Sequence, residues 1–145
     1  MRIKKKAMLI EFSDHTTNYI FTKMQRYIDI HTCITNTPEK FNKKKFLNTK
    51  ILHNHECLNG RNFEIKKIIN YYDKLSSLDQ KILIFLFKRQ NIKNLDEKKL
   101  VKFINYLFTG WDKYIKKNNI NFLIFYLNPH LVYSYIIYII AKKRG

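Results

Sequence analysis

The stretch AMLIEF, from Ala7 to Phe12, is the first apolar run of the chain, and the fold class depends on whether it forms a strand or one edge of a helix. Periodicity does not separate these two structures in so short a run. Three residues after it can cap a helix: Asp14, Thr16 and Thr17. Apolar residues then recur at helical spacing at Ile20, Phe21, Met24, Tyr27 and Ile28, which predicts a helix there.

The helical pattern disappears from His31 to Arg61. This segment contains the turn-forming residues Thr35 to Pro38 and the lysine run Lys43-Lys44-Lys45. We therefore expect a long loop or insertion at about 31–61, with a short extended piece at Phe46 to Leu52. A loop of that length in a compact domain is usually functional or mobile.

Helical patterns return after Phe63. The spacing of Ile65, Ile68, Ile69, Tyr72 and Leu75 predicts one helical face. Ser77 to Gln80 has the form of a capping box for a second helix, and Asn94 to Glu97 can cap a third. We expect the third helix to stop at Thr109-Gly110, because glycine commonly ends helices.

The segment from Ile120 to Ala141 carries no charged residue and is followed by Lys142-Lys143-Arg144. Its length allows a membrane span over 120–141 with a basic flank. Asn128-Pro129 is also a good helix start. We therefore favour a short apolar strand or helix at 120–127, followed by a buried helix at 129–142.

These patterns together predict a mostly α protein, a single compact helical domain over 1–145 with room for one or two short strands. We expect a basic N-terminal arm at 1–6, the irregular basic segment at about 31–61, and a helical core at 63–143.

The net charge is +17, from 28 basic and 11 acidic residues. A charge of this size destabilises a compact fold by self-repulsion, and an anionic partner would offset it. An A/T-rich genome would by itself enrich the chain in Lys, and 23 of the basic residues are Lys. Asp and Glu nevertheless remain few. A basic footprint of this kind favours a nucleic-acid partner, and we expect that partner to be structured RNA.

The basic clusters are the candidate nucleic-acid-binding residues. Lysine holds the phosphate backbone, whereas the scarcity of arginine argues against reading of base sequence. The clusters alternate with aromatic residues, as in KFNKKKF at 40–46, and aromatic rings can stack on unpaired bases. The predicted residues are Lys4, Lys5, Lys6, Lys43, Lys44, Lys45, Lys50, Arg61, Lys66 and Lys67.

A metal site is a second hypothesis, because HNHECLNGR at 53–61 and the nearby His31-x-Cys33 hold both cysteines and three histidines. A structural zinc ion would use His31, Cys33, His53 and Cys57 as its four ligands. The spacing of these residues differs from that of common zinc motifs, and a polar loop with two free cysteines is the simpler explanation. We therefore expect no cofactor, with zinc as the alternative.

Arg26 and His31 resemble the R-x4–6-H pattern of HEPN-type ribonucleases. The resemblance implies a small helical fold in which these two residues act on RNA phosphates. Glycine occurs only at 60, 110 and 145, which excludes a glycine-rich phosphate loop. The acidic residues are scattered and suit helix caps, so a conventional enzyme is not expected.

The resulting expectation is a non-enzymatic RNA-binding structural protein, such as a ribosome-associated component from an A/T-rich or organellar genome. The alternatives are a membrane-associated subunit with 120–141 in the bilayer, a small helical protein-interaction module of viral type, and a HEPN-like ribonuclease. Two cysteines do not make a secreted disulfide framework, so we expect an intracellular location, with an organelle such as the mitochondrion as one setting.

Overall fold

The computed structural model describes residues 4–41, 44–60, 63–90 and 95–145. The chain forms two compact units. Unit 1 consists of Met1–Asn59 and Lys116–Asn128, and unit 2 consists of Gly60–Ile115 and Pro129–Gly145.

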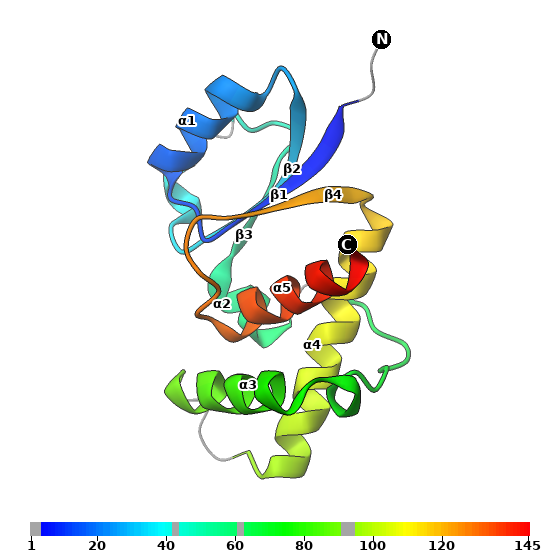
Figure 1. Ribbon diagram of the computed structural model, residues 1–145. Coiled ribbons are helices and arrows are strands. Elements are labelled where there is room, and N and C mark those ends of the chain that lie inside the picture. Colours follow the sequence, from blue (N-terminus) through cyan, green and yellow to red (C-terminus); the bar gives the residue numbers. More distant parts are fainter. Residues whose placement is uncertain (1–3, 42–43, 61–62, 91–94) are drawn as a thin grey trace. The chain divides into compact units, whose positions relative to one another are not determined.

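Unit 1 contains a four-stranded, all-parallel sheet in the order β3-β2-β1-β4 (Figure 1). The strands are β1 (Lys5–Ile10), β2 (Ile28–Thr35), β3 (Lys50–His53) and β4 (Ile120–Phe125). The protein therefore has an α/β fold, and the prediction of a mostly α domain with a loop at 31–61 was wrong. β2 lies largely, and β3 wholly, inside the segment that was expected to be irregular, although β3 overlaps the short extended piece expected at Phe46 to Leu52.

The first four residues of AMLIEF belong to β1, one of the two interior strands of this sheet. Ala7, Met8, Leu9 and Ile10 are all fully buried. Because neighbouring residues of a strand point to opposite faces, burial of four in a row means that both faces are covered. Buried parallel strands read as continuous apolar runs, so AMLIEF shows no alternation that would identify it as a strand.

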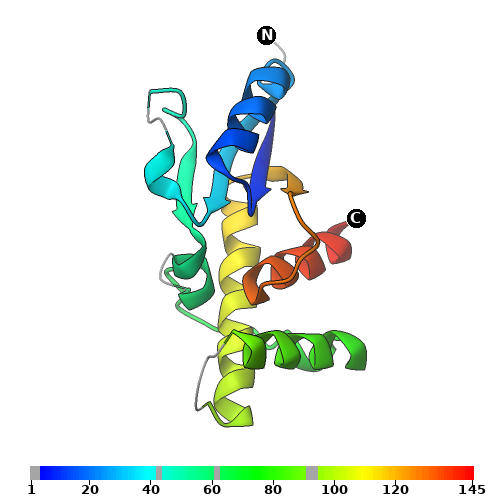
Figure 2. The ribbon, with the colours of Figure 1, turned by 90° about the vertical axis from the view of Figure 1, so that its left-hand side faces the viewer.

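The helix α1 (Asp14–Met24) connects β1 to β2 and covers one face of the sheet (Figure 2). Ser13 caps it by accepting a hydrogen bond from the backbone N–H of Thr16. The helix thus begins and ends earlier than the apolar spacing predicted. Ile28 follows the helical spacing but belongs to β2. The core on this face contains Ala7, Leu9, Phe12, Ile28, Ile30 and Cys33, with Ile20 and Phe21 of α1 packed against it.

The connection from β2 to β3 has no α-helix in its described part. It contains the 3-10 turn η1 (Pro38–Lys40) and then an irregular segment that leads to β3. Phe41 and Phe46 anchor this segment in the core, with their ring centroids 5.3 Å apart. A short helix, α2 (Asn54–Asn59), follows β3. The lysine-rich connection is therefore held at two points by buried rings.

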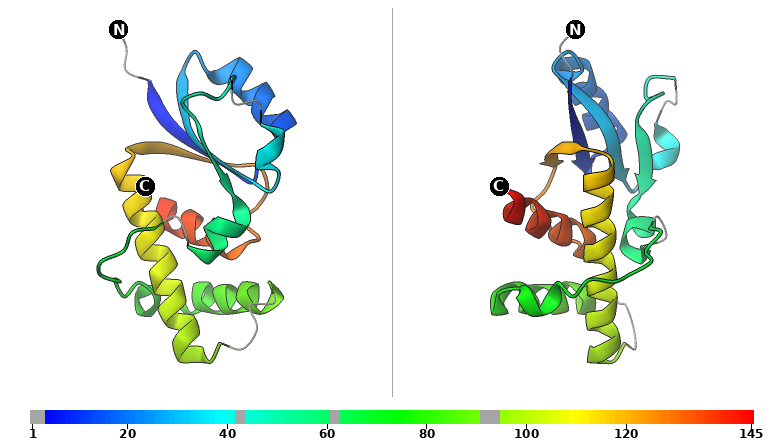
Figure 3. Two further views of the ribbon diagram at one scale, coloured as in Figure 1. Left: turned by 180° about the vertical axis from the view of Figure 1, so that it is seen from behind. Right: turned by 90° about the vertical axis from the view of Figure 1, so that its right-hand side faces the viewer.

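Unit 2 is helical and is shown with the rest of the chain in Figure 3. It contains the 3-10 turn η2 (Tyr72–Lys74), α3 (Ser77–Arg89), most of α4 (Glu97–Lys117) and α5 (Val132–Arg144). Phe87 of α3 packs on Phe103 of α4, and Trp111 of α4 contacts Tyr133 of α5. Helices near residues 77 and 97 and in the tail were predicted. The helix predicted over Ile65 to Leu75 is absent, and only η2 forms there.

Gly110 lies inside α4, so the predicted stop at Thr109-Gly110 was also wrong. A Cβ atom at Gly110 would lie 2.1 Å from Cδ2 of Phe63. The glycine therefore permits close packing of an aromatic ring on the helix, and the helix continues through it.

The charge-free tail is divided between two elements, β4 and α5. The alternative of one continuous span over 120–141 therefore does not hold. None of the helices in the described part of the chain is both long and apolar enough to cross a lipid bilayer.

Candidate nucleic-acid interface

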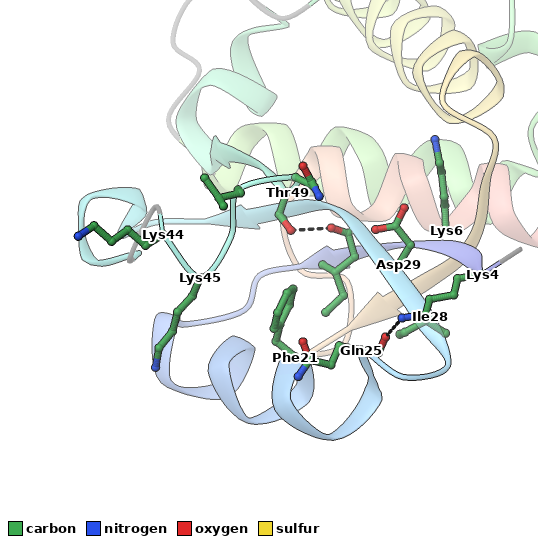
Figure 4. A pocket seen from close by; sticks show the side chains of 12 residues that line it. Lys4, Lys6, Phe21, Gln25, Ile28, Asp29, Lys44, Lys45 and Thr49 are labelled. Atoms are coloured by element: carbon green, nitrogen blue, oxygen red, sulfur yellow. Dashed lines mark hydrogen bonds between the residues drawn. The ribbon is translucent and has the colours of Figure 1, made fainter. Parts of the chain in front are cut away.

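Unit 1 has an open pocket of about 700 Å³ between α1, the beginning of β2 and the segment that precedes β3 (Figure 4). The residues that line it are Lys4, Lys6, Phe21, Gln25, Ile28, Asp29, Ile30, Lys44, Lys45, Leu47, Asn48 and Thr49. They come from three stretches of sequence, which are brought together by the parallel pairing of β1 with β2 and by the anchored β2–β3 connection.

The inner part of the pocket is apolar. Phe21 of α1 is half-buried and packs edge-on against Phe46, with ring centroids 5.1 Å apart. Ile28 and Ile30 are buried beside it at the beginning of β2. Leu47 is 82% exposed, which is unusual for a leucine next to an apolar surface. The pocket therefore has a fixed apolar floor and an apolar side chain at its rim.

Lysines from two distant segments border this floor. Lys4 precedes β1 and donates to the backbone carbonyl of Gln25, at the C-terminal end of α1. Lys44 and Lys45 are exposed and come from the β2–β3 connection. Figure 4 shows Lys4 at one end of the pocket and Lys44 and Lys45 at the other. The sequence predicted all three as binding residues, but as members of two separate clusters.

Lys6 and Asp29 lie at the margin of the pocket and point away from Phe21 (Figure 4). They are partners in the β1–β2 pairing. Ile28 and Ile30 point into the core on the α1 side, so Asp29 between them projects from the opposite face. Among the described lining residues, Asp29 supplies the one carboxylate. The lysines on the α1 side of the pocket therefore have no acidic lining neighbour on that side.

His31 occupies an irregular position in β2, because Ala7 pairs with Ile30 while Met8 pairs with Thr32. Its Nδ1 lies 2.8 Å from the hydroxyl oxygen of Thr32. Partial burial lowers the pKa of the His31 ring, as do the charges of Lys6 and Lys50, against the opposing effect of Asp29. This face of the sheet is thus also basic near the amino ends of β1, β2 and β3.

Two side-chain amides at the pocket are available for binding. The amides of Gln25 and Asn48 make no hydrogen bond with the described residues. Thr49 is different, because its hydroxyl donates to the carbonyl of Ile30 at 2.6 Å. An amide both donates and accepts, so Gln25 and Asn48 could pair with either kind of group on a ligand.

The remaining predicted binding residues do not line this pocket. Lys5 lies over the ring of Phe122, with Nζ 5.6 Å from the centroid. Lys50 is exposed at the beginning of β3, and Lys66 and Lys67 are exposed in unit 2. Lys43 and Arg61 lie outside the described residues. Lys5 and Lys6 begin β1, so the basic arm predicted at 1–6 ends before them.

The Arg26 and His31 pair lies in a turn and in β2, respectively. The resemblance to HEPN-type ribonucleases implied a helical fold, and the parallel sheet does not match it.

The proposed zinc ligands are distributed over β2, β3 and α2. Cys33 and Cys57 are fully buried free thiols. Burial raises the pKa of the Cys33 thiol to about 11 and also raises that of Cys57. Over the described ranges, no three His, Cys, Asp or Glu side chains lie close enough together to hold a metal ion. His53 instead accepts from the backbone N–H of His55.

The sequence missed Phe21, Gln25, Leu47 and Asn48 as members of the site. One signal was present in KFNKKKF, where two phenylalanines flank a lysine run and could have marked an anchored loop. The helical spacing of Phe21 gave no sign that its ring also faces a pocket.

No protein-family model matches the chain, and no significant match was found among curated proteins or solved structures.

Proposed function

We propose that this is a non-enzymatic RNA-binding protein that holds the phosphate backbone through unit 1. The observation that carries the proposal is that Lys4 and the pair Lys44-Lys45, which are distant in sequence, line one open pocket. Flexible ammonium groups around a concave surface suit phosphates, which they contact as point charges without reading sequence.

The charge distribution supports a backbone contact over a sequence-specific one. Arginine is the better bidentate reader of guanine, and the chain has only five. Lys6, at the margin of the pocket, and Lys50, at the beginning of β3, both lower the pKa of His31, so the basic charge extends beyond the pocket floor. A structured RNA offers phosphates in several directions, which suits lysines that point both ways. A ribonucleoprotein in an intracellular or organellar compartment is the setting that we propose.

The test is binding of the full chain to a labelled RNA hairpin over a salt series. The site variant is Lys44→Gln with Lys45→Gln, and the control is Lys98→Gln with Lys102→Gln on exposed positions of α4. Both variants lose the same charge, so a general electrostatic effect would weaken them equally.

We expect the site variant to lower affinity at low salt by about tenfold and to reduce the slope of log K against log salt by about two. The control should change affinity by less than about threefold. Equal losses in both variants, or salt-independent binding, would contradict the proposal. Binding that occurs only to a protein partner would favour the interaction-module alternative.

A further inference from the structure

We propose that the pocket of unit 1 receives one unpaired nucleotide of the bound RNA, with its base on the apolar floor and its phosphate at the lysines. This inference rests on the proposed function and names the form of RNA that the site takes. Phosphate binding alone needs only the lysines. The apolar floor, the exposed Leu47 and the two unused amides need a different explanation.

The floor offers a surface for a flat apolar group. Phe21 is held in place by Phe46, at a centroid distance of 5.1 Å, and Ile28 and Ile30 lie beside it. A ring that is fixed by its neighbours loses little freedom when a base packs on it. Contacts between bases and aromatic rings are a main source of affinity for single strands, and every base has a face that can make them.

The rim supplies what the rest of a nucleotide requires. The amide of Gln25 lies near Phe21 in Figure 4, and the amide of Asn48 also lines the pocket. Base edges carry both donors and acceptors, which an amide can match. Lys4 at one end and Lys45 at the other are placed for phosphates on either side of an inserted base. Leu47, at 82% exposure, would lose solvent contact when the base enters.

The size of the pocket favours one nucleotide over a duplex. A volume of about 700 Å³ lies within the range of small-ligand pockets. A paired base is stacked on its neighbours and cannot enter without being flipped out, which costs free energy. A duplex can therefore reach only the lysines, whereas a loop or a single strand can reach both the lysines and the floor.

The experiment compares a labelled single-stranded RNA with a blunt duplex of the same sequence, using the full chain and fluorescence anisotropy. The test variants are Leu47→Ser and Gln25→Ala, which change exposed side chains. The control is Leu78→Ser, an exposed leucine of α3 at 65%. All three variants keep the net charge, and circular dichroism checks that each is folded.

We expect Leu47→Ser and Gln25→Ala each to weaken single-strand binding by about fivefold to tenfold. Their duplex binding should stay within about twofold of the unmodified chain, and Leu78→Ser should alter neither. An equal loss of affinity for both RNAs, or no loss for the single strand, would overturn the inference. The proposed function would still stand if binding to RNA depends on salt. Absence of binding to either RNA would overturn both.

Discussion

The two units carry almost the same charge and use it differently. Unit 1 contains 13 basic and five acidic residues, and unit 2 contains 15 basic and six acidic. In unit 1, Lys4, Lys44 and Lys45 surround a pocket. In unit 2, charged and polar side chains are joined by internal hydrogen bonds, as between Arg144 and Asp112. Composition alone therefore cannot locate a binding surface in this chain, because its lysine excess is general.

Unit 2 shows how polar groups can hold irregular backbone on a helix. The side-chain oxygen of Asn105 accepts from the backbone N–H groups of Tyr71 and Tyr72, at 2.8 Å each. The hydroxyl of Thr109 accepts from the backbone N–H of Ile69 at 2.9 Å. These contacts satisfy backbone N–H groups of unit 2 at residues 69, 71 and 72. In unit 1, the amides of Gln25 and Asn48 lie at a pocket without a hydrogen bond to the described residues.

The pocket of unit 1 has a fixed floor only if the core of unit 1 is firmly packed. The reactivity of the two buried thiols of unit 1 tests this packing, and it is the largest effect that we expect. Cys33 and Cys57 are fully buried, and burial raises the pKa of both. We expect thiol reagents to react at least about 100-fold more slowly than with the unfolded chain, because the thiolate is the nucleophile. The Cys33 rate should rise as pH approaches about 11.

The control for this measurement is Tyr19→Cys, at a position of α1 that is 65% exposed. Its added thiol should react at nearly the unfolded rate. Fast labelling of Cys33 and Cys57 in the native protein would mean that unit 1 opens readily, and the pocket would then lack a fixed floor.

A stability difference of about 3 kcal/mol is expected when Asn105 is replaced by Leu. This change leaves the N–H groups of Tyr71 and Tyr72 without their acceptor in a buried place. Asn121 in unit 1 is the matched control, since it accepts from the backbone N–H of Lys6 at an exposed site. Asn121→Ala should cost less than about 1 kcal/mol. Urea unfolding followed by circular dichroism compares the two, and similar losses would contradict the contrast between the units.

The Asn105 contacts also explain why one predicted helix does not form. Ile65, Ile68, Ile69, Tyr72 and Leu75 have helical spacing, but Ile68 and Ile69 are about 40% exposed and do not form a buried face. The backbone N–H groups at 69, 71 and 72 are satisfied by side chains of α4 in place of their own helix. Apolar residues do recur at helical spacing in this segment, but hydrogen bonds to side chains of α4 determine its backbone conformation.

The helices with both a period and a cap were predictable, and the sheet was not. Ser76 caps α3 by accepting from the N–H of Asp79, one residue before the expected cap. β1 is buried on both faces and therefore shows no alternation, and the irregular pairing at His31 breaks the alternation in β2. β3 and β4 are short, and together they contain one buried residue. The lysines of the site were visible in the sequence. Their proximity was not, because it depends on the parallel pairing of β1 with β2, in which Lys5 pairs with Ile28.

A smaller effect, about 2 kcal/mol, is expected for Asp112→Ala in unit 2. Asp112 is largely buried, accepts from the Tyr71 hydroxyl at 3.1 Å and pairs with Arg144. The control is Lys99→Ala, which removes an exposed ion pair with Asp96 and should cost less than about 0.5 kcal/mol. Urea unfolding at low and high salt separates them, because only the exposed pair is strongly screened. A salt-sensitive loss at Asp112 would contradict its buried role.

The smallest effect, about 1 kcal/mol, is expected for Tyr135→Phe. The Tyr135 hydroxyl donates to Asp79 at 2.8 Å, and Ser76 donates to the same carboxylate at 2.6 Å. The hydrogen bond from Ser76 lowers the pKa of Asp79 most, and burial opposes it. The hydrogen bond from Tyr135 and the charges of Lys142 and Lys143 lower this pKa further. This stabilisation is present above the ordinary carboxyl pKa and is lost as pH falls through the lower native pKa.

The difference in stability between Tyr135→Phe and the unmodified chain should therefore shrink on acidification. Tyr138→Phe is the control, since Tyr138 is 40% exposed and its hydroxyl has no hydrogen bond to the described residues. Urea midpoints measured from neutral pH to about pH 2 give the comparison. If the Tyr135→Phe loss is the same at every pH, it arises from packing, and the carboxylate of Asp79 contributes nothing through this bond. If it follows the titration, the carboxylate of Asp79 stabilises the packing of α3 against α5 in unit 2.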